Sequence, residues 1–177
     1  MTASVFQQVL GAEFYHLAAA VKQLHARQGD FTYRGRTRIV RGSSWLSRLC
    51  GWAARLPPAM DDAETTVCFS AMPGREIWQR QFGNARMQSR LWPHEGLLCE
   101  RLGAVRFGFH LYRKDAALHW AVHRVHLLGV IPLPASWFDA VRSRESVVDG
   151  RYHFEVQASL PLAGMLVRYE GHLEPVD

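Results

Sequence analysis

The sequence predicts an α+β protein in which an N-terminal amphipathic helix and a second short helix pack on a long, strongly curved antiparallel sheet. Two observations predict this fold class. Apolar residues near the start recur at helical spacing, whereas the chain after residue 65 is a succession of short alternating segments separated by turn signals. A chain of 177 residues suits one domain, 1–177, with a helical part over about 3–58 and the sheet over about 65–175.

Residues 3–27 are expected to form the first helix. Ser4 is the expected N-cap, and Gly29-Asp30 is the expected stop. An apolar stripe on this helix must be covered, and the sheet is the candidate. The stripe recurs at spacings of three and four and consists of Phe6, Leu10, Phe14, Leu17, Val21 and Leu24.

A strand and the second helix are expected next. Over residues 31–40, apolar side chains alternate with arginines, which predicts a strand with one covered face. The second helix, over about 44–56, ends at Pro57-Pro58 because proline donates no backbone hydrogen bond and restricts the residue before it. Its apolar stripe consists of Trp45, Leu49, Trp52 and Leu56.

The remainder of the chain is expected to be β-structure. Pro73-Gly74 and Asp149-Gly150 are turn signals, and the second one joins the expected strands 141–148 and 151–160 into a hairpin. About nine to eleven strands joined by short turns imply an antiparallel meander. Because strand twist accumulates, the sheet is expected to curl into a half-barrel or barrel, lipocalin-like in outline, packed on the N-terminal helix.

Composition narrows the classes of partner. The formal net charge is +5, but the cations are dispersed, so nucleic acid is not an expected partner and an anionic membrane surface is a permitted one.

No apolar run reaches the ~18 residues of a membrane-spanning helix, and the first residues do not resemble a secretion signal. Three cysteines without a CxxC pair fit reduced thiols, and we expect a cytoplasmic protein. No nucleotide-binding glycine loop occurs, and we expect no cofactor.

Three of the nine histidines, His119, His123 and His126, lie within eight residues. On a helix they would share a face, but the tryptophan and valines between them favour a strand. On a strand, His119 and His123 point the same way about 13 Å apart, too far for one zinc ion. His126 then points to the opposite face unless a bulge intervenes. No metal site is expected here, and a solvated sheet face or a proton-transfer role remains open.

The expected function is to bind a small apolar or amphipathic molecule in the hollow of the curved sheet. Such a pocket has an apolar lining and a few polar anchors. The candidate anchors are His119, His123, Arg101 and Arg168. The first alternative is an enzyme of the isomerase or cyclase type, which would require a histidine and a carboxylate to meet in one pocket as acid and base.

The second helix supports another alternative. It combines Trp45 and Trp52 with Arg48 and Arg55, the composition of an interfacial membrane helix or of a lid over an apolar cavity. Packing of its apolar stripe into the core is the simplest expectation. The other two roles would make the protein a membrane-surface or protein-interaction module.

Several longer stretches resemble a known bacterial family. They include Gly96-Leu-Leu-Cys-Glu-Arg-Leu-Gly103, Glu145-Ser-Val-Val-Asp-Gly-Arg-Tyr-His-Phe-Glu-Val156 and Leu160-Pro-Leu-Ala-Gly-Met-Leu-Val-Arg-Tyr-Glu-Gly171. The family is a domain of unknown function, number 4166, and the resemblance runs nearly the full length. It implies no activity, cofactor or catalytic residue. Members also occur fused behind a nicotinamide-cofactor reductase-like domain, so the resemblance implies a role accessory to redox metabolism, with a separate reductase as partner.

Overall fold

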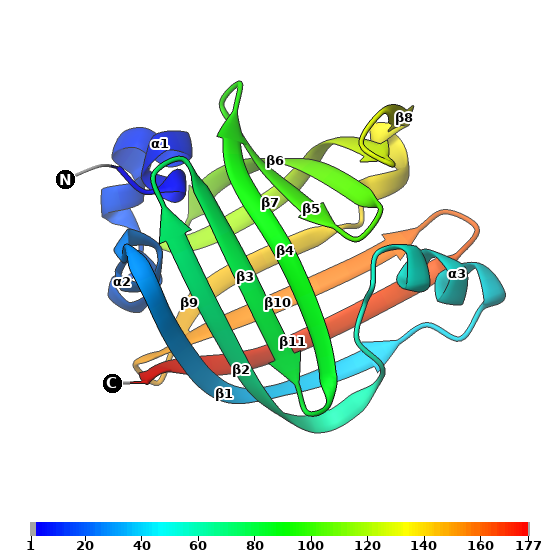
Figure 1. Cartoon of the computed structure of the whole chain (residues 1–177), viewed down its shortest axis with the longest axis horizontal. Helices are drawn as coiled ribbons and strands as arrows, with labels where there is room; N and C mark the ends of the chain where they lie inside the picture. The colour runs from blue at the N-terminus through cyan, green and yellow to red at the C-terminus, as the bar shows by residue number, and fades with distance from the viewer. Residues whose placement is uncertain (1–2, 177) are drawn as a thin grey trace.

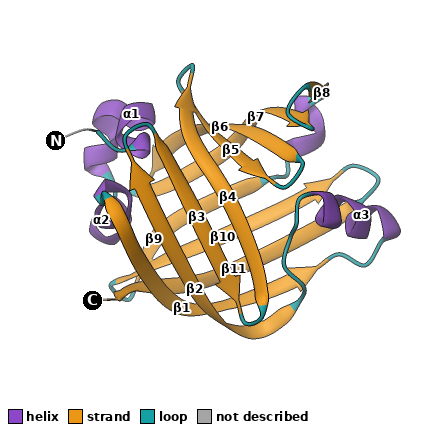
Figure 2. Ribbon diagram, viewed as in Figure 1, coloured by secondary structure: helices purple, strands orange, loops and turns teal. Residues whose placement is uncertain are grey.

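The computed structural model describes residues 3–176 and contains helices at the two ends of a closed barrel (Figures 1 and 2). The helices are α1 (Val5–Leu10), the 3-10 helix η1 (Gly11–His16), α2 (Ala19–Ala26), α3 (Trp45–Ala53) and the 3-10 helix η2 (Ala135–Phe138). The strands are β1 (Gly29–Arg41), β2 (Met60–Met72), β3 (Arg75–Phe82), β4 (Ala85–His94), β5 (Leu97–Leu102), β6 (Val105–Lys114), β7 (Ala117–Leu127), β8 (Ile131–Leu133), β9 (Arg142–Val148), β10 (Arg151–Leu160) and β11 (Gly164–Val176).

The predicted α+β class and the barrel are confirmed. Ten of the eleven strands form an antiparallel meander that closes on itself, because β11 returns to pair with β1, while β8 extends the pairing of β7. Closure removes the sheet edges that would otherwise expose unpaired backbone groups. At the seam, a Cβ atom at Gly35 would lie 1.8 Å from the carbonyl oxygen of His172, so only glycine allows the two strands this approach.

The connections between consecutive strands lie at the two ends of the barrel. The N-terminal helices lie at one end, together with the turns after β2, β4, β6 and β9. The other end, which we call the α3 end, carries α3, β8 and η2 and the turns after β3, β5 and β10. None of the helices within residues 3–176 has the length and apolar character that crossing a bilayer requires.

The N-terminal segment covers its end of the barrel, but not as one helix. The prediction of a continuous helix over 3–27 was wrong: Gly11 ends α1 with φ +56°, and Leu17 and Ala18 are extended before α2 begins. A straight helix of this length would span about 37 Å, whereas the bends keep the whole stripe over the barrel opening. All six stripe residues are buried, and Ser4 caps α1 as predicted, through a capping box with Gln7.

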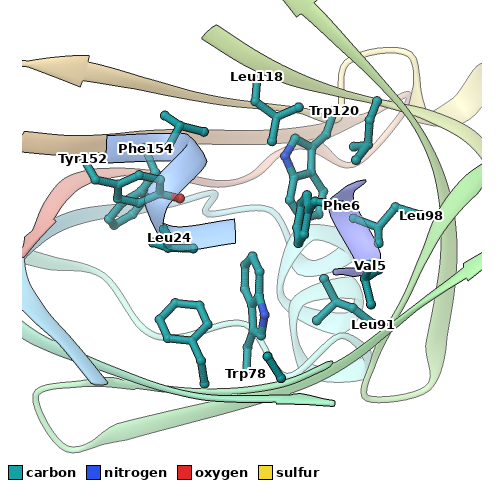
Figure 3. Packing of buried hydrophobic residues seen from close by; sticks show 14 of the residues in the cluster. Val5, Phe6, Leu24, Trp78, Leu91, Leu98, Leu118, Trp120, Tyr152 and Phe154 are labelled. Carbon is teal, nitrogen blue, oxygen red and sulfur yellow. The ribbon is translucent and has the colours of Figure 1, made fainter. Parts of the chain in front are cut away.

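The core divides into two apolar clusters. The larger one joins side chains of the N-terminal helices to the inner faces of the strands, and Figure 3 shows Phe6 beside the indole rings of Trp78 and Trp120. The smaller one lies on the inner faces of β1 to β4 and β11 and contains Ile39, Phe82 and Val167. The alternation in the sequence predicted these inner faces, because successive side chains on a strand point to opposite sides.

The second helix packs in the opposite sense to the simplest expectation. Its buried residues are Ser47 and Gly51, whereas Trp45, Leu49 and Trp52 are 72%, 53% and 78% exposed. The Ser47 hydroxyl donates a hydrogen bond to the Met165 carbonyl oxygen, and the Arg41 guanidinium fills the space beside Gly51. The expectation that the stripe packs into the core was therefore wrong for Trp45, Leu49 and Trp52, because the face of small residues allows α3 to lie closer to the barrel. It was right for Leu56, which follows α3 and packs against the smaller core cluster.

Candidate functional site

A cavity of about 140 Å³ lies inside the barrel and is lined by members of both core clusters. Ten strands enclose a wider interior than the eight whose side chains just fill a small barrel, and this leaves room for the cavity. Its wall is largely aromatic and aliphatic. The segment that follows α3 contributes Ala54 and Leu56 to the wall, and η2 contributes Phe138.

The helices α1, η1 and α2 close one end of the barrel, and we call them the N-terminal plug. One buried polar contact joins this plug to the cavity wall. The ring Nε2 of His25, in α2, lies 2.5 Å from Oε2 of Glu145, in β9, and both side chains are at most 3% exposed. The Phe6 ring stacks on the His25 ring at a centroid distance of 3.7 Å. Glu145 also lines the cavity, so the carboxylate is shared between the plug and the interior.

A second buried carboxylate lies close to this pair. The indole Nε1–H of Trp78 donates a hydrogen bond of 2.9 Å to Oε2 of Glu76, which is 4% exposed. Burial raises the pKa of Glu76, an effect opposed by His25 and by the Trp78 hydrogen bond and reinforced by Glu145. The carboxylate form of Glu76 is therefore destabilised in the folded protein relative to an exposed carboxylate.

Two tyrosines and Arg80 belong to the polar part of the cavity wall. Burial raises the pKa of Tyr169 to about 12 and, with the neighbouring Glu145, raises the pKa of Tyr152 as well. Both phenols consequently keep their proton at neutral pH and are available as hydrogen-bond donors. Arg80 lies over the Trp78 ring, donates a hydrogen bond to the Ser89 hydroxyl and pairs with Glu100 at 3.4 Å.

Trp120 adds a buried donor to the cavity wall, because its indole Nε1–H has no hydrogen-bond partner among residues 3–176. The side chain is 4% exposed and belongs to the cavity wall. A buried donor left unpaired costs about 1–3 kcal/mol, and most such donors in proteins are paired. A ligand with an acceptor atom would satisfy this donor.

The predicted anchors lie on the outside of the barrel, and none of the four lines the interior cavity. His119 is half-buried on the outer face of β7 and stacks on Tyr112 at 5.1 Å. Partial burial, with Arg144 and Lys114 nearby, lowers the pKa of His119. Arg168 is exposed and pairs with Glu170 on its own strand. Whether these side chains bind anything stays a prediction, but they cannot anchor a molecule inside the barrel.

A bulge explains the geometry of the other two histidines. The β6–β7 register shifts opposite Gly108 and Phe109, which leaves His123 as the extra, exposed residue. Alternation then resumes with Val125 buried, so His126 lies outside, on the same face as His119. Within residues 3–176, no group of three or more His, Cys, Asp or Glu is arranged to hold a metal ion.

Arg101, the last of the four predicted anchors, lies near the second predicted helix. An open groove of about 1510 Å³ on the outside of the barrel is lined by Arg101 and by three of the four residues predicted to form a membrane-binding or lid surface, Arg48, Trp52 and Arg55. The backbone of the second helix segment bonds to the turn after β5, where the Ala104 N–H donates to the Ala53 carbonyl oxygen. Two candidates that are far apart in the sequence are therefore brought together outside the barrel.

The sequence analysis missed the polar groups inside. The available signal was a glutamate at a position where the alternation of the strand predicts an inward, apolar side chain. Glu145 shares a strand face with Val141 and Val147. Glu76 shares one with Trp78 and Phe82. His25 lies four residues after Val21, on the edge of the helical stripe. Nothing in these patterns paired His25 with Glu145, which are 120 residues apart.

Together, the closed meander and its apolar cavity with a few inward polar groups define an up-and-down β-barrel. The chain belongs to the family described as Domain of unknown function (DUF4166), whose family model matches residues 17–173. A comparison with curated proteins found no match.

Proposed function

We propose that the protein binds a small apolar molecule that carries one hydrogen-bond acceptor, inside the barrel. The observation that carries this proposal is the apolar cavity with the unpartnered Nε1–H of Trp120 in its wall. The cavity volume of about 140 Å³ is close to the roughly 150 Å³ of an apolar protein cavity that binds benzene. The part of the ligand held inside is therefore about the size of a single ring.

The test compares two probes of similar size, cyclohexanone, which has an acceptor oxygen, and methylcyclohexane, which has none. We expect the change of Trp120 to phenylalanine to weaken the binding of cyclohexanone by about tenfold, because the ketone oxygen then loses a buried hydrogen-bond donor worth about 1–3 kcal/mol. The binding of methylcyclohexane, which cannot use this donor, should stay unchanged. Ligand-observed NMR titration measures both affinities.

A cavity-blocking variant provides the control. Ala158→Phe places a ring in the cavity wall and should abolish binding of both probes, whereas Ala121→Phe, on the outer face of β7, should leave it unchanged. An equal effect of Trp120→Phe on both probes, or retention of binding by Ala158→Phe, would contradict the proposal. Association with a separate reductase, which the family resemblance implies, stays a prediction.

A second candidate function is acid–base catalysis in the same cavity. It is favoured by the convergence of Glu145 and the protonated Tyr152 in the cavity wall, with His25 against Glu145. In such a reaction the Glu145 carboxylate would take a proton from the carbon next to a carbonyl group, while a phenol hydrogen bond would stabilise the enolate oxygen. The proton would then return to carbon, so no oxidant or reductant is needed.

Hydrogen exchange distinguishes the enzyme from a binding protein. In heavy water, the enzyme is expected to accelerate exchange of the α-hydrogens of cyclohexanone by a factor of about 10² or more. Glu145→Gln should remove this acceleration, because an amide cannot accept the proton. Proton NMR follows the exchange. Unaccelerated exchange by a protein that binds cyclohexanone would exclude the catalytic function and leave the binding function intact.

A further inference from the structure

Large apolar side chains are exposed mainly at the α3 end of the barrel. Eight of the eleven exposed large hydrophobic residues lie there, in four segments of the chain. α3 contributes Trp45, Leu49 and Trp52, at spacings of four and three residues on one helix face. The other five are Leu128, Val130, Ile131, Trp137 and Leu162. We call these eight residues the α3 rim.

Hydrogen bonds tie the segments of the α3 rim into one end of the structure. The Ser44 hydroxyl at the start of α3 donates to the Ala163 carbonyl oxygen, beside Leu162. At the other end of α3, Ala53 accepts from the Ala104 N–H, and Ala104 in turn accepts from the Leu128 N–H. β8 and η2 lie at the same end in Figure 1. The rim is therefore one rough patch around the end of the barrel and not eight scattered side chains.

The outer groove brings positive charge to this patch. Trp52 and Leu128 of the α3 rim line the groove, and so do seven arginines, while no aspartate or glutamate among residues 3–176 lines it. Six of these arginines form no ion pair within residues 3–176. Arg41 donates hydrogen bonds to backbone carbonyl oxygens only, and the other five are Arg48, Arg55, Arg86, Arg90 and Arg101. Of the twelve arginines outside the groove, six, among them Arg36 and Arg144, are each paired with a carboxylate.

We propose that the α3 end of the barrel docks on the surface of an anionic membrane. Tryptophan is enriched at the boundary between lipid headgroups and acyl chains, because its ring is apolar and its N–H is polar. The rim supplies three tryptophans and five aliphatic side chains for this layer. The unpaired arginines supply bidentate donors for lipid phosphates. A nucleic acid would use the arginines but would leave the exposed leucine, valine and isoleucine side chains in water.

The docking surface lies outside the cavity, so the proposal is independent of the ligand proposed above. The two are nevertheless adjacent, since the segment that follows α3 lines the cavity through Ala54 and Leu56 and the groove through Arg55 and Leu56. Docking in this orientation would hold that part of the cavity wall against the bilayer, from which an apolar molecule can partition.

Sedimentation with vesicles tests the proposal on the full chain. We expect the protein to sediment with vesicles of phosphatidylcholine and phosphatidylglycerol in equal parts and to bind pure phosphatidylcholine vesicles more weakly. Binding should weaken as salt is raised, because ions screen the attraction of the arginines to the lipid surface. The double variant Trp45→Ser/Trp52→Ser should lose about tenfold or more in vesicle affinity, since it removes two interfacial rings.

Matched variants separate docking from unfolding and from general charge. Tyr15→Ser, at the opposite end of the barrel and 64% exposed, should bind vesicles like the unmodified protein. Arg48→Gln/Arg55→Gln should weaken binding to anionic vesicles and flatten its salt dependence, whereas Arg151→Gln/Arg168→Gln, which removes two ion-paired arginines, should change it less. Cyclohexanone binding by each variant reports that the barrel and its cavity remain intact.

Two results would overturn the docking proposal. One is absence of sedimentation with anionic vesicles at low salt. The other is undiminished sedimentation of Trp45→Ser/Trp52→Ser. If analytical ultracentrifugation instead shows a dimer that this double variant dissociates, and vesicles are not bound, the rim is an interface between two copies of the chain. Loss of cyclohexanone binding alone would contradict the cavity function and leave the docking proposal standing.

Discussion

Replacement of Phe6 by alanine is expected to lower the free energy of unfolding by about 3–5 kcal/mol, the usual cost of truncating a buried phenylalanine. Phe6 is fully buried, stacks on His25 and lies 6.0 Å and 5.6 Å from the rings of Trp78 and Trp120. Its removal leaves a void where the plug meets the barrel. Those neighbours close the void poorly, because each is held by its own strand or helix.

Urea unfolding followed by tryptophan fluorescence measures this effect. Gln8→Ala, on the exposed side of the same helix, is the control and should change stability by no more than about 0.5 kcal/mol. If Phe6→Ala unfolds at the same urea concentration as the unmodified protein, the N-terminal helices do not contribute to the core as the structure shows. Phe6→Leu should lose less, because it keeps part of the buried volume.

Replacement of Glu145 by leucine is expected to cost about 3–5 kcal/mol, because it leaves the buried His25 ring without its hydrogen-bond acceptor. Glu145→Gln keeps an acceptor oxygen and should cost less. The double variant His25→Leu/Glu145→Leu should recover most of the loss, since a buried polar pair is often replaced by apolar residues at little cost. Urea unfolding of the unmodified protein, Glu145→Leu, His25→Leu and the double variant forms a double-mutant cycle.

Glu64→Leu, at an exposed position of β2, is the control for the change of glutamate to leucine and should stay within about 0.5 kcal/mol of the unmodified protein. The proposed pairing of plug and wall is contradicted if Glu145→Leu costs no more than this control. Additive losses in the double variant would also contradict it, because the two side chains would then act independently.

Acidic pH should also affect stability through Glu76. Its pKa is raised in the folded protein, so between the ordinary value of 4.5 and the raised value the folded state binds more protons than the unfolded state. The free energy of unfolding associated with Glu76 is accordingly highest below 4.5 and falls as pH rises through the raised pKa. This is opposite in sign to the effect of Glu95, whose pKa is lowered by its hydrogen bond to Arg124.

The local pattern of the sequence predicted most of the elements but not the continuity of the first helix. The six residues of the helical stripe are all buried, yet the segment is broken at Gly11 and at Leu17–Ala18. The spacing of the apolar residues identifies which side chains must be buried. A bent segment and a straight one have the same spacing, so this pattern does not show where the segment bends. Where the segment bends depends on the width of the opening that it covers, which is a property of the barrel.

By itself, the sequence determined the strands, their turns, the faces that point inward and the apolar stripes of the helices, because these follow from contacts between residues close in the chain. Only the tertiary structure decided that β11 pairs with β1, that α3 turns its tryptophans outward, and that His25 meets Glu145 inside the barrel. The physical reason is that each of these depends on register and closure around the whole barrel, so residues far apart in the chain become neighbours only when the last strand pairs with the first.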